Sequence, residues 1–388
     1  MTDTPVRGQQ SEGKGRDKSA RLALGSTAQC WQLLEDRDVK VIQLASTTEK
    51  PKLSVVIPTY NTEQWIGDAI RSVLAQTEQA IEVIVVDDGS TDDGLTRAKA
   101  WDDPRLTILS QPNQGLSAAR NTGILAARAE MIGFLDSDDI WYPQKAEKHL
   151  ALHAKDLKVG LSFSWSAYLD RDGKETGQLL VSRKTHPSAR DLTERNDIGN
   201  GSTAVVKREL FEQVGLFDEQ LRSCEDLDMW VRIAAETSVA LVLVPEFLTG
   251  YRVREGSLSL SFGTFLEAAT VLRKRFTSLV PGFTESDGNR CYAQLLRIAS
   301  RKALADGQVA VSRRLLGSAL QASHKLLFTD VRALALLAIH GCTFFLPERT
   351  AYASYRATTR FVGTAMSLLF KRPCRPLGVP RRSIQPGS

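Results

Sequence analysis

Short apolar runs alternate with amphipathic helical segments in the first part of the chain. The almost continuously apolar runs, which are typical of buried parallel strands, are residues 53–57, 81–86, 106–109 and 131–135. Apolar side chains recur at helical spacing in residues 63–76, 92–101 and 115–128. Strands that alternate with helices in this order predict an α/β fold with a mostly parallel central sheet and right-handed crossovers.

The pattern changes after about residue 158. Aromatic residues mark a longer strand at 159–169, and Asp172-Gly173 predicts a hairpin turn. A polar, irregular stretch at 183–198 predicts a mobile loop. Further strands are expected at 201–207 and 239–244, and a helix at 225–236.

Only helical periodicity is visible from residue 262 onward. The candidate helices, whose short links predict a bundle, are residues 264–279, 289–305, 308–324, 329–346 and 348–370. Together the patterns predict a flexible N-terminal extension at 1–50, an α/β domain at 51–256, a helical region at 257–370 and a basic disordered tail at 371–388.

Composition and charge narrow the class of protein. Five scattered cysteines without a C-x-x-C pair argue against a disulfide framework or a zinc site. No secretory signal and no apolar run of about 18 residues is visible, so we expect a cytoplasmic protein. Residues from 256 onward hold 19 Lys and Arg against 6 Asp and Glu, a net charge of +13. Since the whole chain carries +5, the preceding part carries −8.

Two acidic clusters follow predicted strands. Asp87 and Asp88 end the second strand, and Asp136, Asp138 and Asp139 follow the fourth. The carboxyl ends of parallel strands meet at one edge of a sheet, where α/β proteins bind ligands. Carboxylates there suit Mg or Mn, which share the phosphates of a substrate. The alternative is an acidic turn that only caps the next helix.

The phosphate-binding loops of two large enzyme classes are missing. Neither G-x-x-x-x-G-K-[ST] nor a G-x-G-x-x-G after the first strand is present. This disfavours P-loop enzymes and nicotinamide dehydrogenases. A nucleotide diphosphate held by a divalent cation is the remaining expectation.

Four segments resemble the signatures of family 2 glycosyltransferases with the GT-A fold, in the order found in that family. They are Val-Val-Ile-Pro-Thr-Tyr-Asn at 55–61, Val-Asp-Asp-Gly-Ser-Thr-Asp at 86–92, Asn-Gln-Gly-Leu-Ser-Ala-Ala-Arg-Asn at 113–121 and Asp-Ser-Asp-Asp at 136–139. The resemblance continues more weakly through Cys-Glu-Asp-Leu-Asp-Met-Trp at 224–230 to Tyr251. It does not cover residues 1–50 or those after about 260.

The resemblance implies an inverting transfer of a sugar from a nucleotide-diphosphate sugar, with a divalent cation as cofactor. It places Pro58, Tyr60 and Asp88 around the base, with Asp88 accepting the base N–H. Arg120 is expected to contact the nucleotide and Asp138 the ribose. Asp139 is the expected metal ligand, supported by Asp136.

Asp226 matches the catalytic base of the family, which must remove the proton of the attacking hydroxyl. Without that resemblance, Asp226 is equally well explained as a first-turn acid that stabilises the helix dipole. Glu225 and Asp228 are rival acids on the same turn. The sequence also departs from the family, because Arg254 stands where many members have a histidine. No Q-x-x-R-W motif is present, so transfer of a single sugar is expected.

The expected acceptor is a glycan or a lipid-linked molecule in surface polysaccharide synthesis, and no nucleic-acid partner is expected. A nucleotide-sugar-binding pseudoenzyme or assembly scaffold is the alternative. A sugar-phosphate nucleotidyltransferase is disfavoured, because no Gly-rich basic loop follows the first strand. The basic helical region predicts either peripheral docking on an anionic membrane surface or a helical bundle that packs on the catalytic domain.

Overall fold

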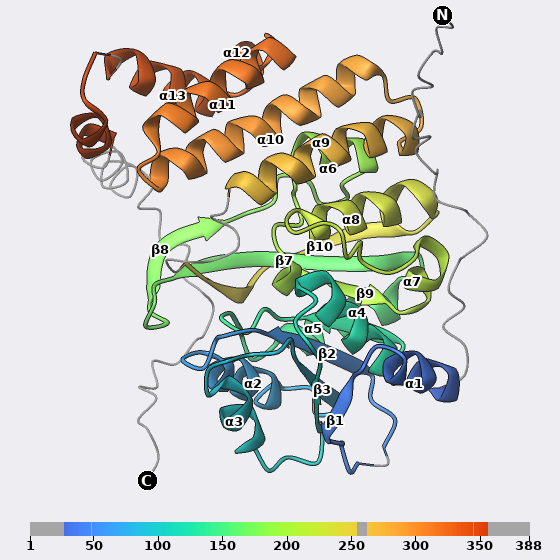
Figure 1. The fold of residues 1–388 in the computed structure, drawn as a ribbon. Helices are drawn as coiled ribbons and strands as arrows, with labels where there is room; N and C mark the ends of the chain where they lie inside the picture. The colour runs from blue at the N-terminus through green and yellow to red at the C-terminus, as the bar shows by residue number, and fades with distance from the viewer. Residues whose placement is uncertain (1–26, 48, 254–261, 344, 356–388) are drawn as a thin grey trace, which may run out of the picture.

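The computed structural model describes residues 27–47, 49–253, 262–343 and 345–355. Within these residues, ten strands form one mixed sheet in the order β1-β4-β3-β2-β5-β9-β7-β10-β6, and β8 pairs with β7. Helices cover both faces of the sheet, and the helices after residue 261 lie together above it (Figure 1). In the described parts of the chain, no helix is long and apolar enough to cross a membrane.

The first half of the sheet is built as the hydrophobic pattern predicts. Its strands β4, β3, β2 and β5 are parallel neighbours. Odd-numbered residues of β2 such as Val55 pack under α2, whereas even-numbered residues such as Val56 pack under α4. The bounds are β2 Leu53–Thr59, α2 Ile66–Leu74, β3 Ile81–Asp87, α3 Gly94–Lys99, β4 Leu106–Ser110, α4 Leu116–Ala126 and β5 Met131–Phe134.

The second half of the sheet is mainly antiparallel. β9 pairs antiparallel with both β5 and β7, whereas β7 and β10 are parallel. β10 is longer than the strand expected at 239–244 and runs on to Arg252, with register shifts between Val244 and Thr249. The bounds are β6 Ile140–Trp141, α5 Lys145–Lys155, β7 Val159–Leu169, β8 Glu175–Leu180, α6 Ala189–Glu194, η1 Gly201–Thr203, β9 Val205–Lys207, α7 Glu209–Val214, α8 Glu225–Glu236 and β10 Ala240–Arg252.

The helical region packs directly on the catalytic sheet. One hydrophobic core contains Phe134 of β5, Trp230 of α8 and Phe276 of α9. Arg275 of α9 also forms ion pairs with Asp218 at 2.7 Å and Asp228 at 2.6 Å. The bounds are α9 Phe262–Leu279, α10 Glu285–Ala305, α11 Val309–Ala322, α12 Leu326–Thr329 and α13 Val331–Cys342.

The predicted boundary between a flexible extension and the α/β domain, at residue 50, is wrong. Among the described residues before it, two elements belong to the domain. Residues 27–35 form α1 (Thr27–Glu35), whose Cys30 and Leu34 are buried in the main core. Residues 40–43 form β1 (Lys40–Gln43), which adds an antiparallel edge strand to β4. Isolated elements this short are marginally stable, and contact with α4 and β4 gives α1 and β1 their stability.

Two other segments differ from the expectation. The predicted loop at 183–198 contains α6, which begins with a capping box between Ser188 and Asp191. The helix predicted at 329–346 is shorter than expected: α13 covers Val331–Cys342 and is capped by the Asp330 side chain, and the separate short helix α12 ends at Thr329. Residues 348–355 are helical, and the rest of the helix predicted to residue 370, together with the tail after it, lies outside the described residues.

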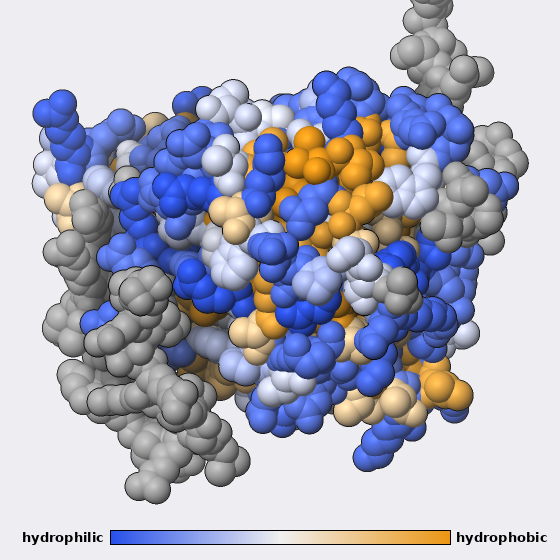
Figure 2. All heavy atoms as spheres, turned by 90° about the horizontal axis from the view of Figure 1, so that it is seen from below, coloured by the Kyte–Doolittle hydropathy of each residue, from blue (hydrophilic) through white to orange (hydrophobic). Residues whose placement is uncertain are grey.

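The surface on the side of α2, α3 and β1 is largely hydrophilic, with one hydrophobic area near its centre (Figure 2). β1 lies on this side in Figure 1 and exposes Val41 and Ile42, and Leu44 just after the strand is exposed as well. An edge strand with exposed apolar side chains is unusual for a free surface. The N-terminal segment is held to the domain by the backbone pairing of β1 with β4 and by the buried face of α1.

We predict that Leu34→Ala destabilises the whole catalytic domain. The Leu34 side chain is 1% exposed in the shared core, and a buried Leu→Ala change costs about 2–5 kcal/mol of unfolding free energy. Chemical denaturation with a single transition should show this loss. Leu44→Ala is the control, since Leu44 is 56% exposed; equal stability of the Leu34→Ala variant and the parent would contradict the revised boundary.

Candidate active site

The two acidic clusters lie at the same edge of the sheet. β2 lies between β3 and β5, so the clusters follow strands that flank a common neighbour and do not pair with each other. Asp88 directly follows β3, and Asp136 follows β5 after Leu135. The parallel register therefore brings both clusters and Tyr60, just after β2, to one rim.

Asp88 shapes the loop that leads into α4. Its Oδ1 accepts hydrogen bonds from the Gln111 side chain at 2.7 Å and the Gln114 N–H at 2.9 Å. Its Oδ2 accepts the Gly115 N–H at 2.8 Å. Gly89 next to it has φ +72°, and a Cβ there would lie 2.9 Å from the Asn113 nitrogen. The buried side chain of Asp88 thus holds this loop in place through three hydrogen bonds. The sequence did not predict this structural role.

Pro58 and Tyr60 border the same rim in different ways. Pro58 is buried within β2 in register with Val86, whereas the Tyr60 side chain beyond the strand is exposed. The Tyr60 ring is therefore available to a ligand, and Pro58 contributes to the floor beneath the rim.

Arg120 of α4 is buried and bridges two parts of the site. Its Nη2 lies 2.7 Å from Asp136, and its Nη1 lies 2.7 Å from Glu225. The guanidinium stacks 5.5 Å from the Phe217 ring centre. Burial lowers the pKa of Arg120, but the nearby carboxylates of Asp136, Glu225 and Asp226 outweigh this and raise it overall. Arg120 was expected to contact the nucleotide; the structure instead commits it to carboxylates.

Gly201 and Ser202 of η1 complete this arrangement, and sequence reasoning missed both. A Cβ on Gly201 would lie 2.7 Å from Arg120 Nη2, so only glycine leaves room for the guanidinium. Ser202 Oγ donates to Asp139 Oδ2 at 2.6 Å and accepts the Asp136 N–H at 3.0 Å. No motif marks these residues, because their role follows from a contact between distant strands.

Asp139, the expected metal ligand, accepts hydrogen bonds from the protein on both carboxylate oxygens. The side chain is fully buried, Oδ2 accepts from Ser202, and Oδ1 accepts the Arg252 N–H at 2.8 Å. Burial and the neighbouring carboxyls of Asp138 and Asp136 raise its pKa well above the usual range. Asp139 therefore anchors the loop to β10, while Asp136 and Asp138 remain half-buried at the rim.

Arg252 is the second anchor of this loop. Its Nε donates to the backbone oxygen of Asp138 at 2.7 Å, and its Nη1 donates to the Arg171 oxygen at 2.8 Å. Arg254, the departure from the family pattern, lies outside the described residues. Within the described residues, no group of three or more His, Cys, Asp or Glu could hold a metal ion. Two rim carboxylates do fit a cation that completes its coordination with substrate phosphates and water.

The amino end of α8 carries three acids, and the structure separates them. Cys224 before the helix has φ 58°, in the left-handed region, which turns the first helical residues toward Arg120. Glu225 is paired with Arg120, and Asp228 is fully buried with Arg232 at 2.8 Å and Arg275 at 2.6 Å. For half-buried Asp226, no ion pair exists within the described part of the chain.

Asp226 also has an unusual proton affinity. Burial and the adjacent Glu225 carboxylate raise its pKa to about 7, although Arg120 opposes the shift. The Asp226 Oδ1 accepts the Leu227 N–H at 2.6 Å. A carboxyl with a pKa near neutrality can exchange a proton under physiological conditions.

Comparison with known proteins identifies the region that holds this site. Residues 54–215 match glycosyl transferase family 2. They form a family 2 glycosyltransferase domain. The expected family is confirmed for these residues.

Curated relatives agree with this assignment. The chain is 35% identical over 211 residues to an uncharacterised glycosyltransferase of Rickettsia conorii, covering 52% of this chain and 34% of that protein. It is 32% identical over 212 residues to one of Rickettsia typhi, covering 50% and 63%. The match thus spans less than two thirds of the length of either relative.

The fold is the expected GT-A type. The structure is similar to Staphylococcus aureus TarS 1–349 in complex with UDP-GlcNAc, with a TM-score of 0.53 and 20% identity, covering 79% of this chain and 92% of that chain. It is also similar to S. aureus TarS with a TM-score of 0.52 and 19% identity, covering 78% and 55%. The fold class predicted from the hydrophobic pattern and the motifs is therefore confirmed.

We predict opposite phenotypes for two neighbouring aspartates. Asp139→Ala removes the acceptor of two buried donors, and each orphaned donor costs about 1–3 kcal/mol, so the unfolding free energy should fall clearly. Asp138→Ala, at the rim, should retain stability and lose cation-dependent binding of a nucleotide sugar. Denaturation and calorimetry on both variants measure this. A stable Asp139→Ala protein that has lost only cation-dependent binding would restore Asp139 as the metal ligand.

Proposed function

We propose that the protein is an inverting glycosyltransferase. It transfers one sugar from a nucleotide-diphosphate sugar to a hydroxyl group of a glycan or lipid-linked acceptor in surface polysaccharide synthesis. The observation that carries this proposal is Asp226, a carboxyl of near-neutral pKa beside the rim acids and outside the ion pairs that hold its neighbours. The TarS neighbour that binds UDP-GlcNAc supports a nucleotide sugar as the donor.

Asp226 acts as the general base of a single displacement. The acceptor oxygen attacks the anomeric carbon on the face opposite the diphosphate. The new bond to the acceptor forms while the bond to the diphosphate oxygen breaks, and the acceptor proton passes to the Asp226 carboxylate. Arg120 positions this base indirectly, because it holds the adjacent Glu225 and the rim acid Asp136 in fixed places.

The donor lies along the rim of the sheet. Tyr60 and Pro58 border the base, and the Asp88 carboxylate accepts its N–H. A carboxylate offers about four lone-pair sites, of which the loop uses three. Asp138 reaches the ribose and, with Asp136, holds the divalent cation. A bound Mg or Mn would offset the negative charge that develops on the leaving diphosphate.

We predict that Asp226→Asn binds the nucleotide sugar normally but loses transfer by about 10²–10⁴-fold, the usual contribution of a general base. A carboxamide has nearly the same shape but cannot accept the proton. Turnover and equilibrium donor binding separate the two effects, with exposed Asp102→Asn as control. Turnover within a few-fold of the parent would exclude Asp226 as the base.

The parent enzyme should show a pH profile set by the same carboxyl. Asp226 is protonated below its pKa of about 7 and therefore inactive as a base, so kcat/KM should rise with pH through that value and level off above it. The residual kcat/KM of the Asp226→Asn variant should lack this rise with pH. A profile that is flat between pH 5 and 8 would contradict this assignment.

The protein is also proposed to work at the cytoplasmic face of a membrane, docked through α12, α13 and the turn that follows. Phe328 is 89% exposed there, and Leu334, Leu337 and Phe345 are exposed as well. Exposed large apolar side chains beside basic residues are typical of surfaces that bind anionic lipid. The net charge of +13 from residue 256 onward favours the same partner. The alternative use of this face is a contact between protein molecules.

Liposome co-sedimentation tests this docking. We expect binding to vesicles with anionic lipid that weakens as salt screens the charges. It should decrease when Phe328 and Leu337 are both changed to Ser, and persist in the control Leu157→Ser, since Leu157 is exposed in the catalytic domain. Equal binding to neutral vesicles, or none to anionic ones, would leave the protein-contact alternative.

A further inference from the structure

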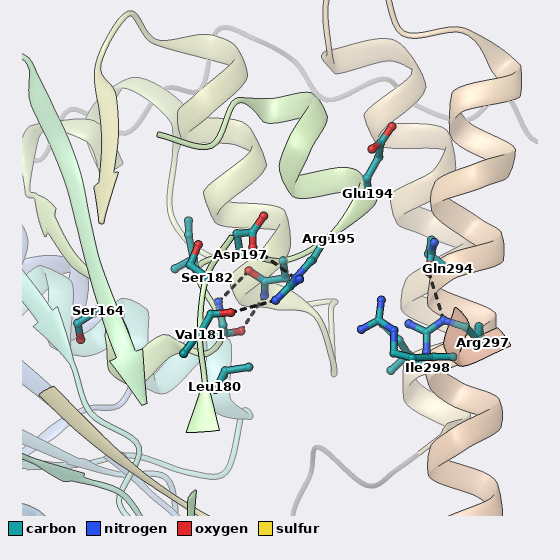
Figure 3. Close-up of a pocket in the computed structure, with 14 residues that line it drawn as sticks. Ser164, Leu180, Val181, Ser182, Glu194, Arg195, Asp197, Gln294, Arg297 and Ile298 are labelled. Carbon is teal, nitrogen blue, oxygen red and sulfur yellow. Dashed lines mark hydrogen bonds and ion pairs between the residues drawn. The ribbon is translucent and has the colours of Figure 1, made fainter. Parts of the chain in front are cut away.

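A cavity lies between the catalytic domain and the helical region, outside the residues assigned above. Its volume is about 190 Å³. One wall is the segment from the end of β8 through residues 194–199, and the other is α10 with the start of α13 (Figure 3). Arginines project from both walls: Arg195 from the loop side, and Arg297 and Arg332 from the helices.

Arg297 is the most buried of these arginines, with 3% of the residue exposed. Its Nε lies 2.8 Å from Asp330 and donates to Gln294 at 3.2 Å. Its two terminal Nη atoms make no hydrogen bond to any described residue. A buried guanidinium with unused donors at a cavity wall is an incomplete arrangement for a group that strongly prefers paired acceptors.

Arg195 and Arg332 also each have one terminal nitrogen without an acceptor among the described residues. Arg195 uses Nε for Asp197 at 3.3 Å and Nη2 for the Val181 oxygen at 3.0 Å. Arg332 uses Nε and Nη2 for Asp330, at 2.8 and 3.1 Å. Among the described residues, Nη1 of each arginine has no acceptor. Three arginines thus offer spare N–H groups around one small cavity.

The acids near the cavity do not fully neutralise these cations. Asp197 pairs with Arg195, Asp330 is shared by Arg297 and Arg332, and Glu194 on the lining contacts Arg290 at 3.4 Å. Burial lowers the pKa of Arg297 to about 10, with Arg332 and Arg301 acting in the same direction and Asp330 opposing them. The pKa of Arg195 is lowered as well, first by burial and then by Arg183 and Arg332, although Asp197 and Asp330 oppose this.

The cavity adjoins the proposed catalytic groups through two connections. Gly199 lines the cavity, and two residues later Gly201 lies against the Arg120 guanidinium that holds Asp136. On the opposite wall, Ile298 of α10 is one helical turn, about 6 Å, from Lys302. The positive charge of Lys302 is close enough to Asp226 for the two to affect each other electrostatically. The cavity is thus near the place where the acceptor must enter, on the side away from β3.

We propose that this cavity binds a phosphoryl oxyanion carried by the acceptor. The inference rests on the proposed function, since it assigns the charged part of the acceptor whose hydroxyl Asp226 activates. Arginine forks match the oxygens of phosphate in paired hydrogen bonds, and the spare donors of Arg195, Arg297 and Arg332 converge on one space. A free phosphate ion has the same chemistry, so the test must separate the two sources.

The first experiment measures binding of inorganic pyrophosphate by calorimetry in EDTA, which removes the cation from the donor site. The full-length protein should bind it at one site. Arg297→Gln should weaken binding about 10- to 100-fold, as expected when hydrogen bonds to a charged group are lost. A change at buried Arg297 can also disturb folding. Arg332→Gln is therefore the second variant, because the Arg332 side chain is largely exposed to solvent. Exposed Arg314→Gln is the matched control, with unchanged affinity.

The second experiment identifies the source of the phosphoryl group. The rate of sugar transfer from a nucleotide sugar with Mn²⁺ is measured for pairs of acceptors, each pair consisting of a hexose and its 1-phosphate. The parent should prefer the phosphorylated member of a pair about 10-fold, and Arg332→Gln should lose this preference. No pyrophosphate binding in EDTA, undiminished binding by Arg332→Gln, or equal rates for both members of every pair would overturn the inference. Failure of the proposed function would appear separately, as no hydrolysis of any nucleotide sugar by the parent with Mn²⁺.

Discussion

The buried guanidinium of Arg120 is the interaction on which the site depends. It joins Asp136, which follows β5, to Glu225, which begins α8 and lies 105 residues after Arg120 in the chain. A buried charge of this kind is stable only while its partners stay in place, and removal of one partner from a buried pair costs about 3–5 kcal/mol. The arginine therefore fixes the distance between the donor rim and the proposed base.

This constraint gives neighbouring acids different chemistry. Glu225 is paired with Arg120, and Asp228 is paired with Arg232 and Arg275. Burial and then the neighbouring Glu225 raise the pKa of Asp226, which has no such pair within the described residues. One helical turn thus holds two structural carboxylates and one carboxyl able to exchange a proton near neutral pH.

The helical region is connected to the same network. Arg275 of α9 reaches Asp228, and Lys302 of α10 lies within electrostatic range of Cys224 and Asp226 at the start of α8. Because the two regions share a hydrophobic core, α10 cannot shift far without disturbing α8. The arginines of α10 and α13 face residues 194–199 across the cavity.

The sequence by itself determined the family, the parallel half of the sheet and the edge where the acids gather, because continuous apolar strands and local motifs need no tertiary information. Tertiary structure alone decided what each acid does. Asp139, Asp136 and Asp138 look alike in the chain, yet a hydroxyl from Ser202 and the Arg252 N–H bury the first and leave the others at the rim. The ordered α1 and β1 and the arginine cavity likewise depend on contacts between residues far apart in the chain, which periodicity cannot report.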